Sequence, residues 1–147
     1  MDILNILEQK WKNVETPFFI HPSGNLFFKD ILEAKTIDIS DIKSGEVVAL
    51  VGDFNPSTIL LLLKLIEKKT IILPLTNDTK EQHDYFFETA LVDVVVKDNS
   101  IKRISHKKKH RLIDYLRKQK NGGLILFSTG TTGSPKAILH DFNKFLK

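Results

Sequence analysis

The residues with the clearest chemical potential form one short loop near the end of the chain. Positions 128–136 hold five hydroxyl side chains, two glycines, a proline and a lysine. Glycines let the backbone turn successive N–H groups inward, and hydroxyls donate hydrogen bonds to phosphate oxygens. Lys136 adds a mobile positive charge. The loop is therefore predicted to bind a polyphosphate, through Ser128, Thr129, Gly130, Thr131, Thr132, Gly133, Ser134 and Lys136.

The spacing within this loop differs from that of two common nucleotide-binding loops. A Walker loop has four residues between its glycines, followed by Gly-Lys-Ser/Thr and a helix. Here two residues separate Gly130 from Gly133, and Pro135 precedes the lysine. The dinucleotide pattern Gly-x-Gly-x-x-Gly is also absent. For this composition alone, the alternative is a flexible hairpin loop without a ligand.

The segments before the loop alternate between apolar runs and capped helices. Strands are predicted at Val47–Val51, Thr70–Leu75, Leu91–Val96 and Leu124–Phe127, and Ala137–Leu139 reads as extended. Helices are predicted at Pro56–Lys68, from Asp78 or Thr79 onward, and at Arg111–Gln119. This order predicts an α/β fold with a mainly parallel sheet flanked by helices. The loop then follows the carboxyl end of a strand, where such sheets bind ligands.

Shorter elements are predicted from local patterns. The N-terminal segment is predicted to form a helix over Ile3–Trp11, a hairpin of Pro17–Ile20 with Leu26–Phe28, and a helix over Lys29–Lys35. Gly24 and Asn25 are expected to supply positive φ in the hairpin. Asn55 is expected to cap a helix, Gln82 to complete a capping box after Thr79, and Asn99-Ser100 to turn into a polar stretch.

Composition limits the classes of protein that this chain can represent. The 147 residues are 41% hydrophobic and 27% charged, typical of one globular domain. A net charge of +4 is too small to indicate nucleic-acid binding by itself. Cysteine is absent, no signal peptide is apparent, and the longest apolar run, Ile59–Leu63, is far too short for a membrane span. We therefore expect a cytoplasmic protein.

Several other residues have structural explanations that are simpler than functional ones. The basic run His106–Arg111 is expected to be a solvated loop rather than a nucleic-acid patch, because it lacks interleaved aromatic residues. His106 and His110 lack a nearby third ligand for a metal. Capping or packing is expected of Asp53, Asn55 and His140, and core packing of Tyr85, Phe86 and Phe87.

The order Phe127-Ser-Thr-Gly-Thr-Thr-Gly-Ser-Pro-Lys-Ala137 resembles the signature loop of the adenylate-forming superfamily. Its members include acyl-CoA synthetases, adenylation domains of nonribosomal peptide synthetases, and luciferases. The usual form is Thr-Ser-Gly-Thr-Thr-Gly-x-Pro-Lys-Gly, so Ser128-Thr129 replaces the first pair and Ala137 the last glycine. Weaker similarities agree in order, at Leu26–Leu32, Val47–Gly52 and Ile71–Leu75.

The resemblance implies an activity and its reactants. Family members condense a carboxylic acid with ATP to give an acyl-adenylate and pyrophosphate, and most then transfer the acyl group to coenzyme A or to a carrier-protein thiol. The loop would hold the β- and γ-phosphates, and Lys136 would be the catalytic residue that steadies the leaving pyrophosphate. The family's Mg²⁺ ligand, ribose-binding aspartate, adenine contacts and C-terminal lid domain lie beyond the equivalent of Lys147.

Residues 1–147 are therefore expected to be a partial N-terminal AMP-binding domain, inactive by itself and without the lid domain. Fatty acids, amino acids and small organic acids are all possible substrates. Coenzyme A and a carrier protein are both possible acceptors. A non-catalytic nucleotide-binding or phosphate-binding module is the second hypothesis. A nucleic-acid-associated protein that uses the basic run is the third.

Overall fold

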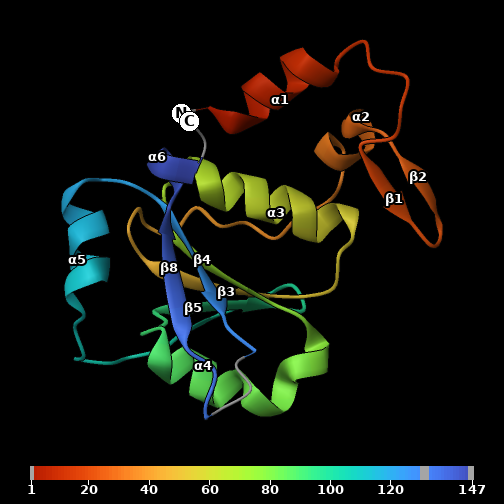
Figure 1. Cartoon of the computed structure of the whole chain (residues 1–147). Coiled ribbons are helices and arrows are strands. Elements are labelled where there is room, and N and C mark those ends of the chain that lie inside the picture. Colours follow the sequence, from red (N-terminus) through yellow and green to blue (C-terminus); the bar gives the residue numbers. More distant parts are fainter. Residues whose placement is uncertain (1, 130–132, 146–147) are drawn as a thin grey trace.

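A six-stranded sheet forms the centre of the protein (Figure 1). The computed structural model describes residues 2–129 and 133–145. The strands are β3 (Val47–Val51), β4 (Ile71–Leu75), β5 (Val94–Lys97), β6 (Ser100–Arg103), β7 (Gly123–Phe127) and β8 (Ala137–Asp141). Their order across the sheet is β6-β5-β3-β4-β7-β8. The four inner strands are parallel and the two edge strands antiparallel, so the predicted mainly parallel sheet is confirmed.

Helices cover both faces of this sheet. Helix α3 (Pro56–Glu67) packs on one face against Val48, Leu50 and Ile72. Helices α4 (His83–Thr89) and α5 (Arg111–Lys118) pack on the other face, where Phe86 and Leu116 meet the opposite side chains of the same strands. Because the inner strands are covered on both faces, they read as continuous apolar runs. A last short helix, α6 (Phe142–Phe145), follows β8.

Two strand predictions needed correction. β5 begins at Val94 rather than at Leu91, because the end of α4 takes up the intervening residues. Leu91 adopts a left-handed φ of 54°, and the Val92 N–H donates to the carbonyl of Phe87, which closes the helix. β6 was predicted only as a polar stretch, since an exposed edge strand carries no apolar alternation.

The segment between β4 and α4 also differs from its prediction. A 3₁₀ helix, η1 (Asn77–Gln82), leads into α4 instead of an α-helix that starts at Asp78 or Thr79. The predicted capping box is wrong, because the Gln82 side chain makes no capping hydrogen bond. The Thr79 hydroxyl donates instead to the Thr76 carbonyl at 3.1 Å.

The N-terminal segment forms a separate layer on the α3 side of the sheet (Figure 1). It contains α1 (Ile3–Trp11), the hairpin β1 (Phe19–His21) and β2 (Gly24–Leu26), and α2 (Phe28–Leu32). Its apolar side chains pack on Leu60 and Leu63 of α3. Gly24 has the expected positive φ, whereas Asn25 does not, and α2 begins and ends earlier than predicted. Among residues 2–129 and 133–145, every helix is too short or too polar to span a bilayer.

Candidate functional site

The predicted phosphate-binding loop is closed at its base by two hydrogen bonds. The Ser128 N–H donates to the Lys136 carbonyl at 2.9 Å, and the Lys136 N–H donates to the Ser128 hydroxyl at 3.1 Å. Ser128 directly follows β7 and Lys136 directly precedes β8, whose ladder pairs Phe127 with Ala137. The two strands therefore bring both ends of the loop together at one point of the sheet edge.

Five of the eight predicted binding residues lie in the part of the loop that the structure describes. Ser128 is half-buried, and Thr129, Gly133, Ser134 and Lys136 are exposed. Gly133 has a φ of 88°, and a Cβ added there would meet no atom within 4 Å. A glycine at position 133 is therefore explained by the backbone conformation rather than by a lack of space for a side chain. Gly130, Thr131 and Thr132 lie outside the described residues.

Helix α4 contacts the loop on both sides of its base. The Tyr85 hydroxyl donates to the Pro135 carbonyl at 2.8 Å, a contact between residues 50 apart in the sequence. The Phe86 ring packs on the ring of Phe127, the last residue of β7, with 4.2 Å between centroids. Tyr85 was expected only to pack in the core, but it is 41% exposed. Sequence reasoning missed this contact because no local pattern links Tyr85 to Pro135.

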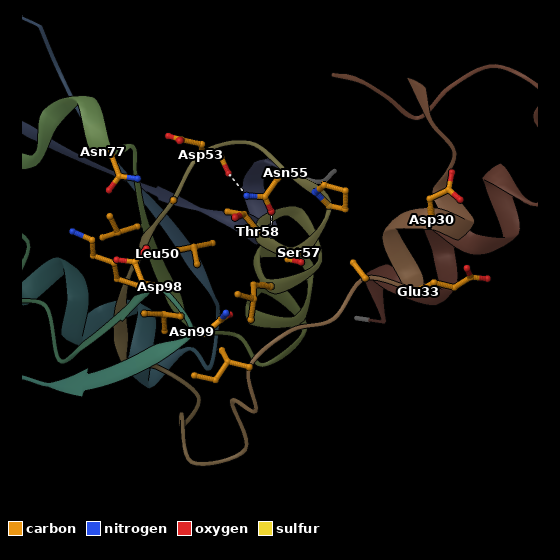
Figure 2. A pocket seen from close by; sticks show the side chains of 18 residues that line it. Asp30, Glu33, Leu50, Asp53, Asn55, Ser57, Thr58, Asn77, Asp98 and Asn99 are labelled. Carbon is orange, nitrogen blue, oxygen red and sulfur yellow. Dashed lines mark hydrogen bonds between the residues drawn. The ribbon is translucent and has the colours of Figure 1, made fainter. Parts of the chain in front are cut away.

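A cavity of about 770 Å³ lies farther along the same edge of the sheet (Figure 2). Its walls come from the ends of β3 and β5, the start of α3, η1 and helix α2. Asn55 caps α3 here by accepting a hydrogen bond from the Thr58 N–H at 2.9 Å, as predicted. Its amide also donates to the Asp53 carbonyl at 3.2 Å, so the β3–α3 turn is fixed locally.

Charge distinguishes this cavity from the loop. The labelled acidic side chains Asp30 and Glu33 come from α2, and Asp53 and Asp98 come from the ends of β3 and β5 (Figure 2). Lys97 is the one basic residue in the lining. Four carboxylates repel a phosphate, so the cavity is a poor phosphate site. No group of three His, Cys, Asp or Glu side chains in the described part of the chain is arranged to hold a metal ion.

The histidines and the basic run have structural roles. His106 pairs with Asp93 at 2.9 Å, and the His110 ring caps α5 by accepting from the Leu112 N–H. Lys108 pairs with Glu88 at 2.6 Å, and this hydrogen bond and charge hold the pKa of Glu88 below its ordinary value. His140 lies on β8, across from Leu124. Residues 104–110 are irregular and mostly exposed, consistent with the predicted solvated loop.

Comparison with known proteins gives matches among solved structures. No protein-family model matches the chain, and no curated protein matches its sequence. The N-terminal subdomain of NpsA from Klebsiella oxytoca, in complex with 3-hydroxyanthranilyl-AMSN, matches 94% of the chain at 18% identity with a TM-score of 0.61. The inhibitor-bound N-terminal domain of FACL13 from Mycobacterium tuberculosis matches 95% of it at 14% identity, with a TM-score of 0.59.

The fold is that of the N-terminal subdomains of adenylate-forming enzymes. A third match, VinN in complex with L-aspartate, agrees, with 14% identity and a TM-score of 0.59 over 94% of the chain. The chain spans 40%, 43% and 42% of these three solved chains. The adenylate-forming fold therefore agrees with the resemblance that the loop sequence indicates.

Proposed function

We propose that this chain provides the phosphate-binding loop of an enzyme that activates a carboxylic acid with ATP. The observation that carries the proposal is the loop itself: its residue order, its place after the inner strand β7, and its occurrence in an adenylate-forming fold. The β7 and β8 strands hold the two ends of the loop, Ser128 and Lys136, together. The acidic cavity nearby would repel the phosphates, and this favours the loop as their site.

The reaction requires an in-line substitution at the α-phosphorus of ATP. A carboxylate oxygen forms a new bond to that phosphorus, and the bond to the bridging oxygen breaks. Pyrophosphate leaves with the electron pair, so negative charge accumulates on its oxygens. Catalysis of such a step depends mainly on positioning and on charge stabilisation.

Lys136 is the residue in this loop that can stabilise the leaving group by charge. Its side chain is exposed directly before β8, and its backbone N–H donates to the Ser128 hydroxyl. The hydroxyls of Ser128, Thr129 and Ser134 are available as further donors. The glycines allow backbone N–H groups to approach the same oxygens.

The other reactants follow from the same proposal. Mg²⁺ would accompany ATP, and by the family resemblance its ligands would lie mainly beyond the equivalent of Lys147. Coenzyme A or a carrier-protein thiol would accept the acyl group. The activated acid could be a fatty acid, an amino acid or a small organic acid.

Calorimetric titration with pyrophosphate and with ATP tests the binding role of the loop. Lys136→Ala should weaken pyrophosphate binding roughly ten- to a hundred-fold, because one charge-assisted interaction is lost. Lys118→Ala, which removes an exposed lysine at the end of α5, serves as the matched control and should change nothing. Equal effects of the two substitutions would refute the assignment to the loop.

Half-reactions of an enzyme that contains this chain test the catalytic role of Lys136. Lys136→Ala should slow carboxylate-dependent exchange of pyrophosphate into ATP but spare transfer from a preformed acyl-adenylate to a thiol, because pyrophosphate has left by then. Equal damage to both half-reactions would contradict the role of Lys136. Phosphate binding without any carboxylate-dependent exchange would instead indicate a non-catalytic binding module.

A further inference from the structure

The peptide bond between Pro135 and Lys136 is held at both of its polar atoms. Its N–H donates to the Ser128 hydroxyl at 3.1 Å, and its carbonyl accepts from the Tyr85 hydroxyl at 2.8 Å. Because a peptide unit is planar, fixing both atoms fixes the plane. The Lys136 carbonyl is held as well, because it accepts from the Ser128 N–H at 2.9 Å. Together the fixed plane and this second contact restrain φ of Lys136, and with it the direction in which the side chain leaves the backbone.

The two hydrogen bonds come from separate parts of the fold. Ser128 belongs to the loop, whereas Tyr85 lies on α4, on the face of the sheet opposite α3. Figure 1 shows α4 at the end of the sheet where β8 begins. The contact therefore ties the exit of the loop to a helix packed on the core.

Tyr85 is not needed to fill the core beneath the loop. Its neighbour Phe86 is 5% exposed and packs on Phe127, whereas Tyr85 is 41% exposed and lies 6.2 Å from the Phe127 ring by centroids. An exposed aromatic side chain could satisfy its hydroxyl with water. Here the hydroxyl bonds the one peptide that carries the loop lysine, and this suggests positioning.

We propose that Tyr85 is a positioning residue that fixes the Pro135–Lys136 peptide and so directs Lys136 toward the bound phosphates. The inference rests on the proposed function of the loop. Without the hydroxyl, the loop exit would sample more conformations, and phosphate binding would have to order it. The hydroxyl acts before the ligand arrives, through the backbone of Lys136 alone.

The decisive substitution is Tyr85→Phe, which removes the hydroxyl and keeps the ring. Tyr115→Phe is the matched control, because Tyr115 is also exposed, at 51%, but lies on α5. In the protein without ligand, Tyr85→Phe should speed hydrogen exchange of the Lys136 and Ser128 amides, measured by NMR. In calorimetry, it should weaken pyrophosphate binding roughly two- to ten-fold. Tyr115→Phe should change neither.

A double-mutant cycle separates positioning from a general structural effect. If Tyr85 acts through Lys136, Tyr85→Phe should have no further effect on pyrophosphate binding when Lys136→Ala is already present. The inference would be overturned if Tyr85→Phe weakened pyrophosphate binding by the same factor with and without Lys136→Ala. Unchanged amide exchange in Tyr85→Phe would overturn it as well. Failure of the unmodified protein to bind pyrophosphate would count against the proposed function instead. Amide exchange without ligand would still decide whether Tyr85 holds the peptide.

Discussion

Single residues at the base of the loop are explained by different physical requirements. Ser128 has a side chain that closes the loop, because its hydroxyl accepts from the Lys136 N–H. Gly133 supplies a backbone conformation, with a φ of 88° and open space around its Cα. Lys136 supplies charge. Substitutions at these three positions should therefore impair the loop in ways that can be distinguished by experiment.

Gly133 allows a test in which backbone conformation and side-chain bulk are separated. Valine and asparagine have similar volumes, but asparagine tolerates a left-handed φ much better than a β-branched residue does. Gly133→Val should weaken pyrophosphate binding roughly five- to thirty-fold. Gly133→Asn should weaken pyrophosphate binding clearly less than Gly133→Val does. Calorimetry on both variants decides the point, and identical losses would mean that bulk rather than φ is limiting.

At the scale of elements, Asp93 connects three segments of the fold that are distant in sequence. Its carboxylate accepts from the Val47 N–H at 2.8 Å, from Arg117 at 2.9 Å, and pairs with His106 at 2.9 Å. Val47 starts β3 and is fully buried, and Arg117 lies in α5. This one side chain thus joins the central strand to the helix that precedes β7.

Asp93→Ala should destabilise the protein by about 2–3 kcal/mol, since it leaves the buried Val47 N–H without a partner and removes the closer of the two carboxylates that pair with Arg117. Urea unfolding measures this loss. Asp114→Ala is the control, because it removes a more exposed carboxylate that lies 3.6 Å from the same arginine. Asp114→Ala should lower the free energy of unfolding by less than about 1 kcal/mol. A loss for Asp93→Ala no larger than that of the control would contradict the role assigned to Asp93.

At the scale of the whole molecule, the sheet brings two unlike sites to one edge. The loop follows β7 and the acidic cavity lies at the ends of β3 and β5, with the end of β4 between them. The carboxyl ends of all four parallel strands meet at this edge, which explains why both sites occur there. The face of the sheet under α4 supports the loop, whereas α2 and α3 form walls of the cavity.

Residues 1–147 alone are expected to show no carboxylate-dependent exchange of pyrophosphate into ATP. The chain spans 40–43% of the length of the three solved chains compared above. The measurement is isotope exchange with a panel of fatty acids, amino acids and small organic acids. Robust exchange with any of them in a clean preparation would show that this chain suffices for adenylation.

The sequence by itself was sufficient for features that depend on near neighbours. A continuous apolar run predicted β3 closely, because strands buried on both faces exclude polar residues. The apolar run Leu124–Phe127 also predicted β7, although Leu126 is 41% exposed. The Asn55 cap was also predicted, since a capping side chain bonds a backbone N–H three residues later. The order of residues in the loop indicated phosphate chemistry and the resemblance that the fold supports.

Tertiary structure alone decided the contacts between distant segments. The pairing of polar β6 with β5, the links made by Asp93, and the hydrogen bond from Tyr85 to Pro135 all depend on which strands become neighbours. No pattern within one segment encodes that choice, because it follows from packing both faces of the sheet at once. The sequence therefore predicts phosphate chemistry for the loop, and the fold decides which residue of α4 forms a hydrogen bond with it.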